Sequence, residues 1–140
     1  MAASGSKLHH VVFCVRPENQ DAAADFWRHL GLAFVEIGLE EEGLRVLLDW
    51  DAGIEIISPT GARGTETDRF ERFLADHGEG VCSVVVDTSC FDDALTVAKQ
   101  HGALVRYQQH REDGGFSLDE ADLTPLYGMP VSFLSTNRPD

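Results

Sequence analysis

Two ionisable side chains lie in strand-like segments of this chain, where their chemistry would matter. His10 belongs to the run LHHVVFCV, and Glu55 belongs to the run GIEIISP. A carboxylate inside an apolar strand is costly without a partner. An imidazole beside it would form an acid/base pair, and the same two residue types can also bind a divalent metal. The sequence therefore predicts a functional pair, in which the partner of Glu55 is His10, Arg45 or a ligand.

The second half of the chain repeats this pattern without the two ionisable residues. The runs GVCSVVVD and MPVSFLS correspond to the two segments above, and a helix ending in glycine follows the first strand in both halves. A nearly constant separation along the chain sets Ser83 against His10 and Ser132 against Glu55, which indicates a duplicated unit. Because a neutral hydroxyl is a weak metal ligand, the two halves of such a site would be chemically unequal.

Each half is predicted to contain a strand, a helix and three further strands. Those of the first half cover residues 8–15, 19–30, 32–39, 44–50 and 53–59. Those of the second half cover residues 81–87, 91–101, 104–109, 116–120 and 131–134. The two modules, 7–59 and 80–135, are joined by a linker helix within 60–79, and together form one domain over 7–140. The chain is long enough for one compact domain with a core and too short for two independent ones.

Side-chain alternation in the first strand sets His10 on one face and Phe13 and Val15 on the other. The bulkier face is expected to pack under the helix, for which Asn19 is the predicted cap and Gly31 the terminating glycine. The helix stripe Phe26, Trp27 and Leu30 is also assigned to the core. The predicted core residues are Val11, Phe13, Val15, Phe26, Leu30, Val84, Val86, Leu95, Val131 and Phe133.

The composition excludes several classes of partner. Eleven basic residues against 24 acidic ones give a net charge of −13, which argues against DNA or RNA as a ligand. No apolar run approaches the roughly 20 residues of a membrane span, and no signal peptide is recognised. The cysteines Cys14 and Cys82 lie in apolar strands, typical of buried thiols in a reducing compartment. We therefore expect a cytoplasmic protein.

Two βαβββ units with a histidine on the first strand and a glutamate on the fourth resemble the vicinal oxygen chelate superfamily. This superfamily includes glyoxalase I, extradiol dioxygenases and bleomycin resistance proteins. The segments IEIISP and RFLADHGEGV are most similar to the branch of methylmalonyl-CoA epimerase and glyoxalase. The resemblance covers residues 7–134 and implies an α+β fold, in which two modules form curled mixed, mainly antiparallel sheets with helices outside.

The resemblance also implies four ligands for a divalent metal, from the first and fourth strands of both modules. His10 matches the first ligand and Glu55 the second, but Ser83 and Ser132 stand where a histidine and a glutamate are expected. Catalytic metal sites usually supply at least three protein ligands. His9, His110 or Glu120 could complete the set if their strands present them inward. We therefore expect no cofactor, with a divalent metal as the alternative.

Two classes of function follow from this site. The first is a small-molecule-binding protein of glyoxalase or bleomycin resistance type with a degenerate metal site, which binds or converts a metabolite or antibiotic. The alternative is a metal-dependent epimerase or lyase, an isomerase or lyase of the vicinal oxygen chelate type. The proposed catalytic residues are His10 and Glu55. The ligand-binding candidates are Ser83, Ser132, Arg45, Trp50, His110 and Glu120. Family members of this size commonly pair, so the resemblance implies a homodimer.

Overall fold

The computed structural model describes residues 5–64 and 66–137, and these divide into two compact units. The N-terminal unit consists of residues 10–82, and the C-terminal unit combines the residues up to 9 with those from 83 onward. Residue 65 of the predicted linker and residues 138–140 of the predicted domain lie outside the described residues. Within the described residues, no helix is long and apolar enough to cross a membrane.

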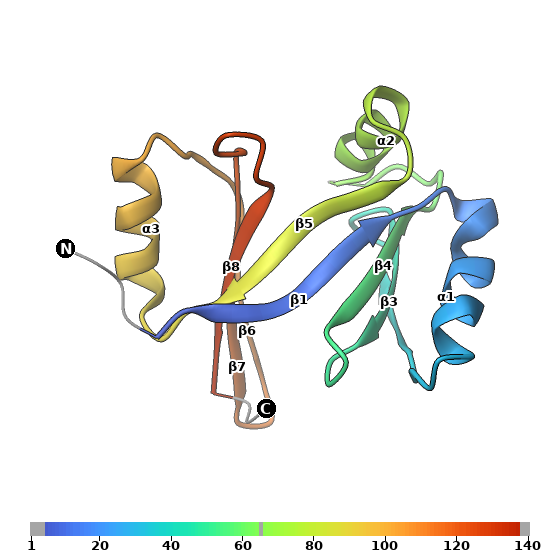
Figure 1. Cartoon of the computed structure of the whole chain (residues 1–140), viewed down its shortest axis with the longest axis horizontal. Coiled ribbons are helices and arrows are strands. Elements are labelled where there is room, and N and C mark those ends of the chain that lie inside the picture. Colours follow the sequence, from blue (N-terminus) through green and yellow to red (C-terminus); the bar gives the residue numbers. More distant parts are fainter. Residues whose placement is uncertain (1–4, 65, 138–140) are drawn as a thin grey trace. The chain divides into compact units, whose positions relative to one another are not determined.

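The N-terminal unit is a mixed four-stranded sheet with two helices (Figure 1). Its strands follow the order β2-β3-β4-β1, with β1 and β4 parallel and the other two pairings antiparallel. Helix α1 packs against β4, and α2 lies near the carboxyl ends of β1 and β4. The elements are β1 (Lys7–Cys14), the 3-10 helix η1 (Pro17–Asn19), α1 (Gln20–Arg28), β2 (Val35–Leu39), β3 (Leu44–Asp49), β4 (Ile54–Pro59) and α2 (Thr67–Asp76).

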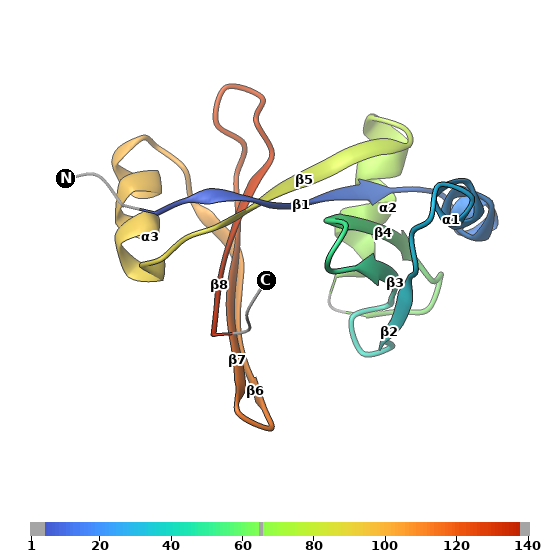
Figure 2. The ribbon, with the colours of Figure 1, turned by 60° about the horizontal axis from the view of Figure 1, so that its bottom comes forward.

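The C-terminal unit repeats the same order of elements. Its strands run β5-β8-β7-β6, again with one parallel pairing, β5 with β8, and two antiparallel ones. Helix α3 packs against β8, and the β6–β7 hairpin extends well past it, as Figure 2 shows. The elements are β5 (Gly80–Asp87), α3 (Phe91–Gln100), β6 (Val105–Asp113), β7 (Phe116–Leu123) and β8 (Val131–Thr136). The predicted βαβββ order is confirmed in both units.

Helices α1 and α3 end in the same way. Gly31 has φ of 100° and Gly102 has φ of 93°, a left-handed conformation that favours glycine. The amide of each glycine donates to a carbonyl three residues earlier, and the next amide donates to a carbonyl five residues earlier. This pair of bonds is the Schellman motif. The repeat seen in the sequence therefore extends to the hydrogen bonds of the helix ends.

The inward face of α1 differs from the predicted one. Gln20 and Ala24 are buried, whereas Phe26 and Leu30 are 60% and 63% exposed. The stripe that faces the sheet passes through Gln20, Ala24 and Trp27, so the prediction is confirmed for Trp27 and wrong for Phe26 and Leu30. The side chain of Asn19 does not cap the helix. Its side-chain nitrogen Nδ2 donates a hydrogen bond to the Glu79 carboxylate instead.

Among the described residues, a cluster of buried apolar side chains lies between each sheet and its helix, and further buried residues such as Val12, Val46, Val85 and Leu134 lie outside these clusters. Ala24, Leu47 and Ile56 form the cluster under α1, and Ala98, Ala103 and Leu123 form the cluster against α3. The predicted core residues that pack at the edges of these clusters are partly buried: Val15, Leu95, Val131 and Phe133. Phe13 contacts Trp27, so the predicted orientation of β1 is correct. None of the ten predicted core residues is fully buried, because one helix covers only part of each outer face.

Candidate functional site

His10 and Glu55 lie together on the face of the N-terminal sheet that is turned away from α1. In the parallel pairing of β1 with β4, Glu55 is opposite Val12, and alternation sets His10 in the same phase. His10 Nε2 is 3.4 Å from Glu55 Oε1, and the two side chains are 8% and 18% exposed. The predicted partnership is therefore present in the fold. We call this pair the first half-site.

Arg45 is not the partner of Glu55. It is opposite Ser58 in the β3–β4 pairing, three positions from Glu55 and therefore on the other face of β4. Its guanidinium lies 2.9 Å from Glu36 and 3.0 Å from Asp21. The hydrogen bond with Glu36 is the main cause of a raised pKa for Arg45. The structure thus gives Arg45 partners on the α1 side of the sheet.

Ser83 and Ser132 also lie together, in the C-terminal unit. Their hydroxyl oxygens are 2.6 Å apart, and both residues are buried. Ser132 donates a further hydrogen bond to Asp122 Oδ1. Ser132 is directly opposite Asp122 in the antiparallel β7–β8 pairing. We call Ser83, Ser132 and Asp122 the second half-site.

Asp122 is the site residue that the sequence analysis missed. The predicted strand ended at residue 120, but β7 continues to Leu123. Continuing the alternation two residues past Glu120 would have set Asp122 on the same face. The signal was available, but the short, polar appearance of this segment concealed it. The prediction that His10, Glu55, Ser83 and Ser132 all converge stays a prediction.

Of the candidates on β6 and β7, Glu120 shares the face of the second half-site and His110 does not. Glu120 is partly buried on β7, in phase with Asp122. His110 is exposed on β6, with Nδ1 at 2.7 Å from Asp119 and Nε2 at 3.1 Å from Glu112. These two hydrogen bonds, that with Asp119 foremost, raise the pKa of His110. Because Asp119 is out of phase with Asp122, His110 does not share the face of the second half-site.

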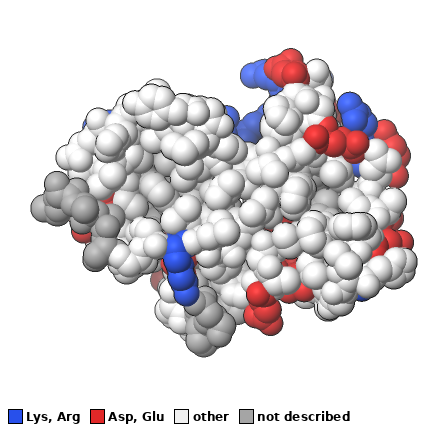
Figure 3. All heavy atoms as spheres, in the orientation of Figure 1, with Lys and Arg blue, Asp and Glu red and all other residues white. Residues whose placement is uncertain are grey.

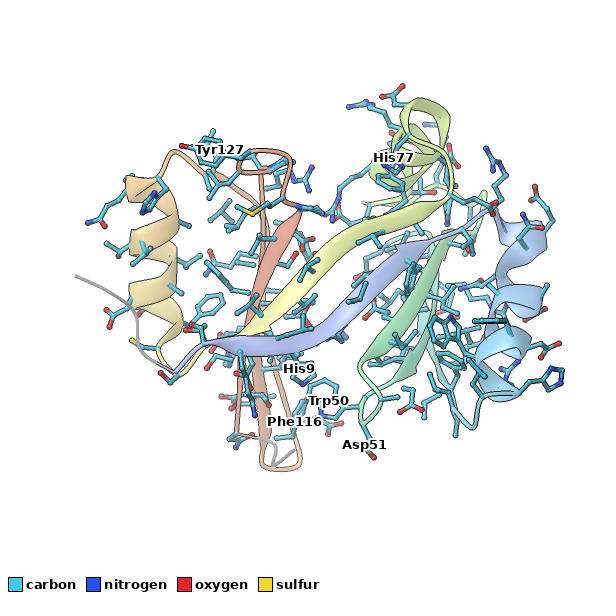
Figure 4. The ribbon with its side chains drawn as sticks, viewed as in Figure 1. His9, Trp50, Asp51, His77, Phe116 and Tyr127 are labelled. Atoms are coloured by element: carbon cyan, nitrogen blue, oxygen red, sulfur yellow. The ribbon has the colours of Figure 1, made fainter. Side chains whose placement is uncertain are left out.

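The last two candidates are Trp50 and His9. Trp50 is partly buried in the turn from β3 to β4, beside Asp51, as Figure 4 shows. His9, offered as an additional ligand, is partly buried on β1 and follows the opposite phase from His10. Their roles as ligand-binding or metal-binding residues stay predictions.

Charged side chains are unevenly distributed on the surface. On the face drawn in Figure 3, charged side chains gather over α1 and α2, whereas the area over α3 and β8 is largely uncharged. Exposed apolar side chains of the C-terminal unit include Leu104, Val105, Tyr127 and Met129. The C-terminal unit therefore offers apolar surface that its own helix does not cover.

The donor set does not fit the divalent metal that the resemblance implies. The first half-site supplies one imidazole and one carboxylate. The corresponding serines supply neutral hydroxyls, which are bonded to each other and to Asp122. Among the described residues, no three His, Cys, Asp or Glu side chains are grouped so that they could hold an ion. We therefore derive no chemical step through a bound metal.

Comparisons with known proteins show the fold. No family model matches the sequence, and no curated protein matches it. A hypothetical protein of Bacillus halodurans is 17% identical with a TM-score of 0.74, over 98% of this chain and 99% of that one. A variant of methylmalonyl-CoA epimerase from Streptomyces coelicolor, bound to 2-nitronate-propionyl-CoA, is 21% identical with a TM-score of 0.69, over 94% and 98%. A variant of 4-hydroxymandelate synthase from the same species is 14% identical with a TM-score of 0.73, over 96% of this chain and 50% of that one.

Proposed function

Because the chain has the vicinal oxygen chelate fold, we propose that it binds a small molecule through the sheet faces that carry its half-sites. It would be a protein of glyoxalase or bleomycin resistance type with a degenerate metal site. The ligand is a metabolite or an antibiotic with an apolar body and a polar edge, the usual composition of such pockets. Its polar edge contacts His10 and Glu55.

The observation that carries this proposal is the first half-site. Glu55 and His10 form a mostly buried contact on a sheet face, and a mostly buried carboxylate is retained at a cost in solvation. A structural role alone would be served as well by two apolar residues of similar volume. An imidazole–carboxylate pair can instead accept and donate hydrogen bonds, and can exchange a proton with a bound ligand.

A metal-dependent epimerase or lyase is the second candidate function. Two observations favour it: His10 and Glu55 correspond to the first two metal ligands implied by the resemblance, and they are in contact. A structurally similar protein, a variant of methylmalonyl-CoA epimerase, is in complex with 2-nitronate-propionyl-CoA. This candidate needs at least one more strong ligand than the first half-site provides.

A binding experiment tests the first candidate. Calorimetric titration of methylmalonyl-CoA, propionyl-CoA and a panel of 2-oxo and 2-hydroxy acids would identify the class of ligand. We expect His10→Ala to abolish binding of whichever compound binds the wild type, without loss of fold. The control is His29→Ala, which removes an exposed imidazole at the end of α1. Equal binding by wild type and His10→Ala would contradict the proposal.

Metal analysis separates the two candidates. The protein is purified without a chelator or a metal-binding tag, and its metal content is measured by mass spectrometry. We expect no stoichiometric divalent metal. About one equivalent of zinc, manganese, cobalt, nickel or iron per chain, lost in Glu55→Gln, would overturn the metal-free assignment and favour the epimerase or lyase.

The proposal includes a cytoplasmic homodimer built from one domain per chain. The exposed apolar side chains of the C-terminal unit support pairing, because apolar patches on a surface commonly mark an interface. Light scattering at micromolar concentration tests this assembly. A mass of one chain would refute the dimer.

A further inference from the structure

A groove of about 290 Å³ lies in the N-terminal unit, and none of its lining residues belongs to the first half-site. Three segments line it: the start of η1, the segment at the end of β4, and the later turns of α2. Pockets for drug-sized ligands hold about 300–1,000 Å³. The volume of this groove therefore suits a ligand smaller than a drug, of about the size of an amino acid.

The segments that lead into the groove are tied together by hydrogen bonds. The hydroxyl of Ser58 donates to the carbonyl of Val15 over 2.7 Å, and Ser58 is only 1% exposed. This bond joins the ends of β4 and β1, directly before Pro59 and Arg16. The amide of Thr60 donates to a carbonyl of the β2–β3 turn over 2.9 Å. The walls of the groove are therefore in place before a ligand arrives.

Most of the lining is apolar, and it includes Pro17, Pro59, Leu74 and Ala75. Leu74 is 9% exposed and anchors α2 to the unit. Ala75 is exposed beside it, so the helix contributes both a fixed floor and an accessible edge. A Cβ atom at Gly61 would meet no atom within 4 Å, so this side of the groove is open. An apolar body can therefore enter and bury surface against the lining.

A basic side chain, Arg16, lines the same groove. Its guanidinium has five N–H donors. Among the described residues it pairs only with Glu79, with Nη1 at 3.4 Å from Oε1, which is longer than an ordinary hydrogen bond. Glu79 is held more closely by the Arg16 main-chain amide at 2.9 Å and by Asn19 at 2.8 Å. Most donors of the guanidinium can therefore serve a ligand, and a carboxylate matches their geometry.

An acidic side chain, Glu71, lines the groove as well. Its Oε1 accepts a hydrogen bond from the hydroxyl of Thr67 over 3.5 Å, and it pairs with no basic side chain of the described residues. A ligand with only an anionic group would be repelled by Glu71, and one with only a cationic group would be repelled by Arg16. A ligand that carries both charges complements both side chains.

We propose that this groove binds a free amino acid with an apolar side chain. The carboxylate of the amino acid pairs with the Arg16 guanidinium, its ammonium group donates to Glu71, and its side chain packs on Pro17, Pro59 and Leu74. This site is separate from both half-sites and does not depend on the function proposed for them.

The test uses three probes that share a branched apolar body. L-leucine carries both charges, 4-methylpentanoate lacks the ammonium group, and 3-methylbutylammonium lacks the carboxylate. Each is titrated into the full-length, isotope-labelled protein, and amide shifts are followed by NMR. We expect leucine to move the amides of Thr60, Gly61 and Ala75. Each analogue should bind about tenfold more weakly than leucine, because it lacks one hydrogen bond between charged groups.

Two variants and their matched controls test the two charges. Arg16→Gln and Glu71→Gln should each weaken leucine binding about tenfold, for the same reason. Arg72→Gln on α2 and Glu18→Gln on η1 make the same changes in charge outside the groove lining, and should bind leucine as the wild type does. All four side chains are exposed, so the variants are expected to fold. His10→Ala should also leave leucine binding unchanged.

The result that would overturn the proposal is clear for each arm. Leucine that leaves the groove amides in place at millimolar concentration, or that binds no better than either analogue, would overturn it. An equal loss in a variant and its control would reveal a general effect of charge and would also overturn it. Leucine shifts at His10 and Glu55 in place of the groove would transfer the amino acid to the first half-site. If Arg16→Gln lacks the dispersed spectrum of a folded protein, Glu71→Gln and the analogues decide.

Discussion

The two units share their strand order and helix ends, but their sheets carry different chemistry at corresponding positions. The first strand and the fourth strand supply His10 and Glu55 in the N-terminal unit, and Ser83 and Ser132 in the C-terminal unit. Each pair is in contact and mostly buried. The two units therefore share a paired polar site at corresponding strand positions, made of different residue types.

The carboxylate is not lost from the C-terminal unit but occurs on a neighbouring strand. In the N-terminal unit, Glu55 on β4 is opposite Leu48 on β3. In the C-terminal unit, the corresponding strands hold Ser132 on β8 opposite Asp122 on β7. The acid therefore lies on the fourth strand of the N-terminal unit and on the third strand of the C-terminal unit. A metal that needs ligands on the first and fourth strands lacks a direct ligand in the C-terminal unit, whereas a hydrogen-bonded site retains a carboxylate there.

The largest effect is expected from making the second half-site resemble the first. The double substitution Ser83→His and Ser132→Glu would complete the four ligands implied by the resemblance. If the four side chains converge, the variant should take up about one equivalent of zinc or manganese, because three or four strong ligands suffice to hold such an ion. Elemental analysis and a rise in melting temperature on adding metal would detect it.

The control for this gain is the same variant carrying Glu55→Gln, which removes a ligand from the other unit. It should lose most of the added affinity. Metal uptake that is unaffected by Glu55→Gln would show that the two half-sites do not share an ion. That outcome would contradict the predicted convergence and restrict the comparison to each unit alone.

The next effect in size concerns the two cores. Leu47 and Leu123 are each 2% exposed and lie in the clusters under α1 and against α3. Leu47→Ala and Leu123→Ala should each lower the free energy of unfolding by about 2–5 kcal/mol, because each leaves a cavity. Denaturant titration followed by circular dichroism measures this loss.

Leu30→Ala is the matched control for these leucines, since Leu30 is 63% exposed. Its effect should stay within about 0.5 kcal/mol. A loss as large as that of Leu47→Ala would restore Leu30 to the core, where the sequence pattern assigned it. A small effect in only one of the two core variants would show that the units contribute unequally to stability.

The comparison of Leu30 with Leu47 also explains what the sequence could predict. Strand alternation was sufficient to orient β1 and to pair His10 with Glu55, because a period of two leaves only two faces to choose from. Which face of α1 packs on the sheet was harder to predict, because a helix can turn any of several side-chain stripes inward. Ala24 is small, so the buried stripe of α1 was less conspicuous than the exposed Phe26 and Leu30, and the larger apolar residues were preferred.

The second half-site was predictable only in part, for a related reason. Ser83 and Ser132 followed from the repeat, but their third member depends on the length of β7. The segment from Asp119 to Asp122 is acidic and interrupts the apolar pattern expected of a strand. Its pairing with β8 stabilises it as a strand, and this long-range pairing decides where the strand ends, although strand alternation was enough to place Asp122 on the same face once the strand was extended.

A smaller effect is expected at the cysteines, and it tests how closed the His10 face is. Cys14 is fully buried, and burial is the main cause of a pKa raised to about 12, with Glu79 adding to it. Since the thiolate is the reactive form, Cys14 should react slowly with a disulfide reagent below that pH. Cys90 is exposed and Cys82 is buried, so one fast thiol is expected per chain.

Cys90→Ser should abolish the fast phase of the reaction, followed by absorbance and assigned by mass spectrometry. Unfolding in denaturant should then release two more thiols, those of Cys14 and Cys82. Fast labelling of Cys14 in the native protein would show that the sheet face of the first half-site opens to solvent. That outcome would contradict the burial of the first half-site.

The smallest effect contrasts the two faces of β7, where Asp122 serves the second half-site and Asp119 serves His110. The hydrogen bond with Asp119 raises the pKa of His110 above its ordinary 6.5. A raised pKa means that the folded protein binds this proton more tightly than the unfolded chain. The stabilisation is therefore complete below pH 6.5 and is lost as the pH rises through the folded value. Because His110 is exposed, we expect only a slight loss of stability, confined to the β6–β7 hairpin.

An NMR titration of the His110 imidazole should give a midpoint above 6.5 in the wild type and one nearer 6.5 in Asp119→Asn. Asp122→Asn is the control on the opposite face. A larger shift in Asp122→Asn than in Asp119→Asn would contradict the assignment of these two acids to separate faces.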